Sequence, residues 1–164
     1  MRITRSKLRR TAAHAVEFAF VCPVVLLLIF GILEYCRYLM TLHVTDNAVR
    51  EGSRYALART DTFQTSLTTA GVQAYVTTYM NSAGLQLNAP TVSVYKCNQA
   101  GQPLDINGTV VANASLATTF DQTTFGDYIC VQIVGTYQPV LPSFLSLAPN
   151  ITVTSTAIMC SEGN

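Results

Sequence analysis

The sequence predicts an α+β fold: a long N-terminal transmembrane and amphipathic helix, a second shorter helix, and a C-terminal antiparallel β-sheet of three or four strands. Three observations predict it. An apolar run near the N-terminus continues into a charged helical pattern, proline is absent from residue 24 to residue 89, and the hydrophobic period changes to two from Pro90 onward.

Composition places the chain among membrane or secreted proteins. Its 164 residues leave room for one ordinary domain plus a tail or a membrane span. Hydrophobic residues make up 49% and charged residues 12%, whereas about 25% of a typical soluble domain is charged. We therefore expect one apolar anchor and one exterior domain.

The charges are distributed unevenly along the chain. Five of the ten Lys and Arg residues lie within the first ten positions, and beyond Thr60 the only base is Lys96. By the positive-inside rule, this asymmetry predicts a cytoplasmic N-terminus, with the bulk of the chain outside. Basic clusters also bind nucleic acid, but the apolar run that follows within eight residues favours topology. We expect a basic cytoplasmic leader over residues 1–12 and no nucleic-acid partner.

The apolar run from Phe18 to Leu33 contains sixteen residues without a charge. As a helix it spans about 24 Å, short of a hydrocarbon core of about 30 Å. The span must therefore extend backwards and include Glu17, an acid that costs at least about 2.5 kcal/mol when unpaired in a membrane. Pro23 should kink or locally open this helix, because proline lacks an amide donor. A cleaved secretory signal is the alternative, but bulky and charged residues follow the run in place of a small-residue cleavage site.

The helical pattern continues after the span. Between residues 34 and 59, opposite charges recur three or four positions apart, the spacing that sets side chains next to each other on a helix. We therefore expect one helix over residues 13–59. A second, weaker helix is expected from Thr65 to Asn81, with Gly84 marking its C-cap region. Its predicted apolar stripe consists of Leu67, Ala70, Ala74 and Val76.

Three segments show the hydrophobic period of two that is typical of β-strands: TVSVYKC (91–97), YICVQIVGTY (128–137) and ITVTSTAIMC (151–160). If the last two pair antiparallel, Ile129 lies by Met159 and Val131 by Ala157, which places both apolar faces on one side. The fourth strand of a four-stranded sheet would be a short one over residues 109–112, and we expect the rest of residues 98–124 to be loop. Residues 60–164 are thus expected to form an exterior α+β domain, with a helix covering the apolar face of the sheet.

Three cysteines belong to this exterior domain. Alternation places Cys97, Cys130 and Cys160 on the face opposite the apolar side chains, so one disulfide is plausible in an oxidising compartment. We expect the bond between Cys97 and Cys130, because closing the long loop between them gains about 3 to 4 kcal/mol in the chain-entropy model. A Cys130 to Cys160 bond and fully reduced thiols are the alternatives.

Motifs for catalysis or metal binding are absent from the sequence. There is no nucleophile elbow, phosphate-binding glycine loop or H-E-x-x-H, and the cysteines form no C-x-x-C pair with a partnering histidine. We therefore expect no enzyme activity, no cofactor and no metal. Three N-x-S/T sequons, at Asn107, Asn113 and Asn150, indicate glycosylation only weakly, because a chain rich in Asn, Ser and Thr contains them by chance.

The connection QPVLPSFLSLAPN, residues 138–150, is unusually long and apolar for a link between strands. With three prolines to stiffen it, we expect it to serve as a contact loop through Leu141, Phe144 and Leu145. The alternative is that these side chains pack beneath the sheet as a satellite of the core.

Two stretches carry a resemblance to a known family. TAAHAVEFAFVCPVVLLLIFGILEYCR followed by AVREGSRYAL resembles the TadE-like minor pilins (pseudopilins) of the tight-adherence (Tad) secretion system, which builds type IVc pili in bacteria. The resemblance is good over residues 9–59 and weaker at the closing AIMCSEG. It implies a minor pilin that takes part in assembly, priming or capping of a Tad pilus and in surface adhesion.

The resemblance also implies residue roles. A prepilin peptidase would cut between Ala12 and Ala13, where the family normally has Gly before the cut. Glu17, then the fifth residue, would neutralise the new α-amino group of a neighbouring subunit; a Glu17 solvated among headgroups is the alternative. Pro23 would adapt the helix to a bundle of pilin helices.

The family's second signature is matched by Arg50, Glu51, Gly52 and Arg54. We interpret it as a salt-bridged helix face on which Gly52 allows another helix to approach closely. The alternative is a solvated face that contributes little to stability.

The resemblance implies partners and a location as well. The partners would be other minor pilins, the major pilin, the prepilin peptidase, an inner-membrane assembly platform and membrane lipid. The chain would cross the bacterial inner membrane once, with its N-terminus cytoplasmic and its C-terminal domain periplasmic until assembly carries that domain into an extracellular pilus. The runner-up function is a single-pass anchored binding ectodomain that does not enter a filament.

Overall fold

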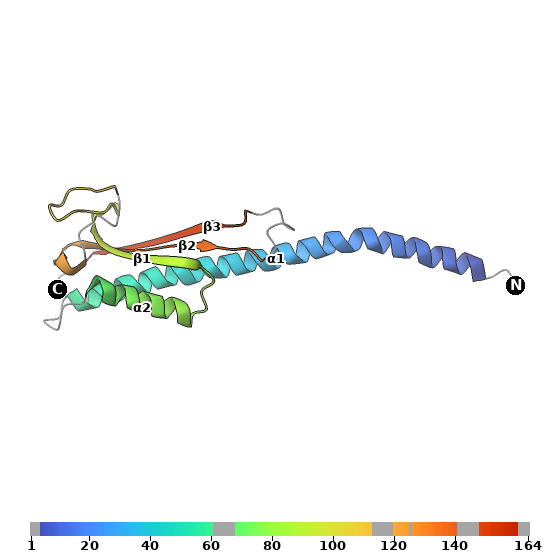
Figure 1. The fold of residues 1–164 in the computed structure, drawn as a ribbon, viewed down its shortest axis with the longest axis horizontal. Coiled ribbons are helices and arrows are strands. Elements are labelled where there is room, and N and C mark those ends of the chain that lie inside the picture. Colours follow the sequence, from blue (N-terminus) through green and yellow to red (C-terminus); the bar gives the residue numbers. More distant parts are fainter. Residues whose placement is uncertain (1–3, 61–67, 113–119, 125, 141–147, 161–164) are drawn as a thin grey trace. The chain divides into compact units, whose positions relative to one another are not determined.

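The computed structural model confirms the predicted α+β fold. It describes residues 4–60, 68–112, 120–124, 126–140 and 148–160, with side chains from residue 14 to residue 58 in the first range. The elements follow in the order α1 (Thr4–Thr60), α2 (Thr69–Ser82), β1 (Asn88–Cys97), the 3-10 turn η2 (Phe120–Gln122), β2 (Tyr128–Tyr137) and β3 (Ile151–Cys160) (Figure 1). The contacts divide the chain into two units, Met1–Tyr38 with Pro139–Pro149 and Leu39–Gln138 with Asn150–Asn164.

The first unit contains the apolar part of α1. Within His14–Ala58, the most apolar window of the helix has a mean hydropathy of 2.7, and none of that window is buried. By length and composition, this helix is suited to cross a membrane. The large apolar side chains from Val16 to Leu33 are exposed.

The second unit consists of two layers. One layer is a three-stranded antiparallel sheet in the order β1-β2-β3. The other is formed by the C-terminal part of α1 with α2 beside it, and Figure 1 shows both helices along one face of the sheet. Apolar side chains from both layers fill the space between them: Ala48, Val49, Ala56, Val72, Val76, Met80, Val94, Phe120, Ile129, Val131 and Ile133.

The register of the sheet agrees with the prediction. Ile129 pairs with Met159 and Val131 with Ala157, so the apolar faces of β2 and β3 both turn toward the helices. Both strands also begin and end at the predicted residues. β1 begins at Asn88, earlier than expected, and its pairing is irregular before Thr91.

Two hydrogen bonds fix α1 to the edge strand β3. The Ser155 hydroxyl donates to the Asp46 carboxylate. The Ser53 hydroxyl donates to the carbonyl of Val49 at 2.8 Å and lies 3.5 Å from that of Ala157. Because Ser53 and Ser155 are both buried, these bonds provide partners for hydroxyl groups that water does not reach.

Helix α2 has well-formed ends. The Thr68 hydroxyl accepts the Gly71 amide at 3.2 Å as an N-cap. At the other end, the Leu85 amide donates to Met80 and the Gly84 amide to Asn81, which is a Schellman motif with Gly84 at a positive φ of 68°. The predicted role of Gly84 is therefore confirmed.

The predicted stripe of α2 was wrong in part. Val76 is buried as expected, but Ala70 and Ala74 are exposed, and the buried face is Val72, Val76 and Met80. Leu67 lies outside the described residues. The reason is packing area: the larger side chains recur every four positions and bury more apolar surface against the sheet than alanines can.

The predicted fourth strand over residues 109–112 was also wrong, because Val110 forms only an isolated bridge with Leu104. The Asp105 carboxylate accepts the amides of Asn107 at 2.9 Å and Thr109 at 2.8 Å. These bonds hold the segment in a turn and use an amide that a strand would need for its ladder.

A second turn, residues 98–102, lies against the face of the sheet opposite the helices. The Asn98 side chain accepts the amides of Ala100 and Gln102 and thereby closes the turn. A Cβ added to Gly101 would lie 2.6 Å from the Ile158 Cδ1 atom on β3. The turn therefore covers part of the face that the alternation pattern had assigned to polar side chains.

Candidate functional site on helix α1

Glu17 lies among the exposed apolar side chains of α1. Its carboxylate is 3.8 Å from the His14 Nδ1 atom, one helical turn away, and both side chains are more than three-quarters exposed. Ala12 and Ala13 have helical backbone, and their side chains lie outside the described part of the chain. The structure thus brings a carboxylate and an imidazole together within a segment that is otherwise apolar.

Pro23 lies inside α1, and the helix continues through it. Proline has no amide hydrogen, so the carbonyl four residues earlier, that of Ala19, lacks its usual helical donor. The helix is therefore weakened at Pro23 by the loss of a backbone hydrogen bond, at the position that the sequence predicted.

Gly52 is the contact point between the two helices. A Cβ at this position would lie 2.4 Å from the Val76 Cγ2 atom of α2 and 3.5 Å from the Val131 Cγ1 atom of β2. The first distance is too short for any real side chain, so only glycine allows α2 to lie this close. The neighbouring helix anticipated at Gly52 is thus, in this structure, α2 of the same chain.

Glu51 is also engaged within the chain. Its carboxylate accepts the Tyr75 hydroxyl of α2 at 3.1 Å, and Arg54 lies 4.0 Å away on the same helix. The Tyr75 ring stacks on Tyr55 with 4.0 Å between the ring centroids. The hydrogen bond to Glu51, followed by burial, raises the pKa of Tyr75 above its ordinary value. Together, Gly52 and Glu51 fix α2 against α1.

The two arginines of the signature face away from this contact. His43, Asn47, Arg50 and Arg54 are exposed and follow one another three or four positions apart, so they share one face of α1. Among the described residues Arg50 forms no ion pair, and Arg54, 72% exposed, has only the long contact with Glu51. We call these two residues the Arg50–Arg54 strip. It presents positive charge on an exposed face of α1.

Glu34 is a buried acid at the end of the apolar segment, only 7% exposed. Its carboxylate accepts the Val140 amide at 3.3 Å and lies 3.4 Å from the Arg37 guanidinium. The spacing of Glu34 and Arg37 indicated the ion pair, but nothing local indicated the bond to Val140, which is distant in sequence. The expected contact residues Leu141, Phe144 and Leu145 lie outside the described residues.

Cys97 and Cys130 are buried together on the face of the sheet opposite the helices. Both are free thiols, and Tyr95 packs with them. The hydrogen bond between the thiols and burial raise the pKa of Cys97, and the hydroxyl of Tyr95 also has a raised pKa through burial and its bond to Cys130. The bond from Cys97, assisted by Tyr95 and opposed by burial, lowers the pKa of Cys130. Within the pair, Cys130 is therefore the thiol that ionises first.

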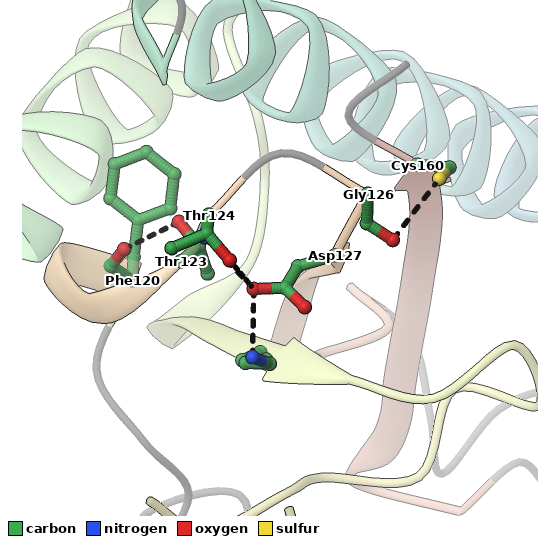
Figure 2. Close-up of polar contacts among 7 residues, drawn as sticks. Phe120, Thr123, Thr124, Gly126, Asp127 and Cys160 are labelled. Carbon is green, nitrogen blue, oxygen red and sulfur yellow. Dashed lines mark hydrogen bonds and ion pairs between the residues drawn. The ribbon is translucent and has the colours of Figure 1, made fainter. Parts of the chain in front are cut away.

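The sheet register excludes a disulfide between Cys97 and Cys160. Cys97 and Cys160 both pair with Tyr128 from opposite sides, so two strand spacings, about 9.5 Å, separate them. This exceeds the roughly 7 Å that a disulfide bridges. The Cys160 thiol instead lies 3.6 Å from the Gly126 carbonyl (Figure 2). A Cys97 to Cys130 bond remains a prediction.

Among the described residues of the second unit, Lys96 and Asp127 form the closest ion pair, with 2.7 Å between Nζ and Oδ2. The same carboxylate accepts the amide and the hydroxyl of Thr124 at 2.8 and 2.9 Å (Figure 2). Burial opposes the charged carboxylate, but the bonds from Lys96 and Thr124 outweigh burial and lower the pKa of Asp127. Asp127 thus ties the segment before β2 to β1.

Within the part of the chain that the structure describes, no group of three His, Cys, Asp or Glu side chains is arranged to hold a metal ion. The chemically notable features are instead an acid in an apolar helix segment and a basic strip further along the same helix.

A family model matches the chain within helix α1. The family model described as TadE-like protein matches residues 13–54, a segment that contains Glu17, Pro23 and all four residues of the second signature. No curated protein and no solved structure matches the chain.

Proposed function

The chain is a TadE-like protein by the match over residues 13–54, and from this premise we propose that it is a minor pilin, or pseudopilin, of a Tad pilus. It assembles with partner pilins through α1 and presents the sheet-containing unit outside the membrane. The family membership supports an association with the Tad pilus, and the helix supports the role within it.

The observation that carries the proposal is Glu17 among exposed apolar side chains. In a bilayer, a lone carboxylate is unfavourable by at least about 2.5 kcal/mol, so a partner cation is needed. Within the same chain, the His14 imidazole lies 3.8 Å from the Glu17 carboxylate. The α-amino group of a neighbouring subunit, freed by cleavage between Ala12 and Ala13, carries a positive charge when protonated and pairs with Glu17 during assembly.

The residues of the second signature have two roles, one in contacts within the subunit and one in contacts with other subunits. Gly52 and Glu51 hold α2 against α1. The Arg50–Arg54 strip then meets acidic side chains of other minor pilins or of the major pilin. Such a contact at a partly exposed surface sets orientation and partner choice more than affinity.

The charge distribution and the apolar helix support one crossing of the bacterial inner membrane. The basic leader lies in the cytoplasm, where the prepilin peptidase and the inner-membrane assembly platform act on it, and the exterior unit lies in the periplasm until assembly carries it into the pilus. The chain itself has a structural role and catalyses no reaction.

Substitution of Glu17 tests the proposal. Glu17→Gln removes the charge at nearly constant shape, and Glu17→Asp keeps the charge and serves as the matched control. We expect both variants to remain in the membrane fraction after alkaline extraction. Co-isolation of partner pilins should fall for Glu17→Gln and be largely retained for Glu17→Asp. Equal recovery of partners with wild type and Glu17→Gln contradicts assembly through a Glu17 ion pair and favours the anchored binding ectodomain.

A further inference from the structure

We infer that Asn107 is a modification site, the acceptor for an N-linked oligosaccharide transferred from a polyprenyl diphosphate carrier. Its sequon, Asn-Gly-Thr over residues 107–109, is one of three in the chain. The inference rests on the exterior position proposed above for the sheet-containing unit, because such transfer occurs outside the cytoplasm.

The structure distinguishes the sequons. Asn107 is exposed, and among the described residues its side-chain amide forms no hydrogen bond. The Asn150 carbonyl oxygen accepts a bond from the Gln138 side chain at 3.1 Å. The hydroxyl residue of that sequon, Thr152, lies inside β3 and pairs with Thr136. Asn113 lies outside the described residues.

The backbone presents Asn107 at the tip of a closed turn. Asp105 accepts the amides of Asn107 and Thr109 through one carboxylate oxygen. The Gly108 amide donates to the Asp105 carbonyl at 3.1 Å. The donors in these bonds are all backbone amides. Among the described residues, the side-chain amide of Asn107 and the hydroxyl of Thr109 therefore remain available, and these are the two groups that a transferase recognises.

The space around the turn is open. Gly108 has a φ of 78°, and a Cβ added there would meet nothing within 4 Å. Ile106 beside it is 73% exposed and Val110 is 50% exposed. An enzyme can therefore approach this side of the turn, and a sugar attached to Asn107 would shield Ile106 from water.

A glycan at this position does not disturb the core. The base of the turn is tied to β1 by the bond from the Leu104 amide to the Lys96 carbonyl at 3.0 Å and is closed by the bond from the Val111 amide to the Pro103 carbonyl at 2.9 Å. The side chains of the main core lie on the opposite face of the sheet. Mass added to Asn107 thus extends into solvent.

The transfer balances without an oxidant or reductant. The Asn107 Nδ2 atom attacks the anomeric carbon of the carrier-bound sugar, and a carbon–nitrogen bond forms as the bond from that carbon to the diphosphate oxygen breaks. The diphosphate leaves with the electron pair, and the Nδ2 proton passes to a base of the transferase. The Thr109 hydroxyl positions the acceptor.

The test expresses the full chain in a bacterium that contains an N-oligosaccharyltransferase and its polyprenyl diphosphate oligosaccharide, with an established exported acceptor as positive control. A C-terminal reporter that is active only outside the cytoplasm gives the topology. We expect glycopeptide mapping to find the oligosaccharide on Asn107. The modification should be lost in Asn107→Gln and Thr109→Ala and retained in Thr109→Ser and Asn150→Gln.

The outcomes separate this inference from the proposed function. An active reporter with unmodified Asn107, or with sugar only on Asn113 or Asn150, overturns the inference and leaves the pilin proposal intact. Modification that survives Thr109→Ala also overturns it. An inactive reporter with unmodified Asn107 overturns both the inference and the proposed topology.

Discussion

Gly52→Ala is the substitution whose effect the structure predicts most sharply. At an open position within a helix, alanine is more favourable than glycine by about 1 kcal/mol. At Gly52, however, the new Cβ would lie 2.4 Å from the Val76 Cγ2 atom, and overpacking of this kind costs about 1 to 3 kcal/mol. We therefore expect Gly52→Ala to lower the free energy of unfolding by up to about 2 kcal/mol.

A double-mutant cycle with Val76→Ala isolates this contact. Val76→Ala leaves a cavity on its own, but it removes the atom that the new Cβ meets, so the two substitutions should compensate by about 1 kcal/mol or more. Denaturant unfolding of the full chain in detergent, followed by circular dichroism, measures each free energy. Asn47→Gly and Asn47→Ala, at an exposed position of α1, calibrate the helix-propensity contribution. A Gly52→Ala protein about 1 kcal/mol more stable than wild type, as at an open helix position, would refute the close approach of α2.

Two further predictions concern the second unit, which contains the sheet. Because the pKa of Asp127 is lowered, its bonds to Lys96 and Thr124 stabilise the fold above the ordinary aspartate pKa of about 3.9 and lose this contribution as pH falls through the lowered value. Asp127→Asn should therefore be less stable than wild type at neutral pH and show a smaller loss below about pH 4 in unfolding measured against pH; an unchanged pH profile contradicts this. Under oxidising conditions we expect non-reducing peptide mapping to find Cys97 linked to Cys130, and a Cys97 to Cys160 peptide would be incompatible with the sheet register.

Local pattern was sufficient to predict the sheet. The period of two in β2 places Ile129, Val131 and Ile133 on one face, and the threonines of β3 mark the opposite face of that strand. Only one register places Ile129 by Met159 with both apolar faces on one side. The start of α2 was less predictable, because a sequence rich in Thr and Ala gives a weak periodic signal. For the same reason, the predicted apolar stripe of α2 contained Ala70 and Ala74 in place of Val72 and Met80.

Features that depend on distant residues could not be predicted from the sequence. The burial of Cys97 and Cys130 follows from a turn that covers the second face of the sheet, and nothing in the alternation of β1 indicates such a cover. The bond from Val140 to Glu34 joins segments separated by most of the chain. Gly52 was recognisable as a close-approach residue, but which helix approaches it depends on the tertiary structure.

The N-terminus of the mature protein tests the central claim most directly. If the chain is a pilin subunit that assembles through Glu17, a prepilin peptidase must create the α-amino group that pairs with it. The protein should be purified from membranes of cells that contain the peptidase and its partner pilins, and its N-terminus determined by sequencing and intact mass. We predict a mature chain that begins at Ala13. A chain that retains the basic leader, or one cut after the apolar segment, would contradict the account.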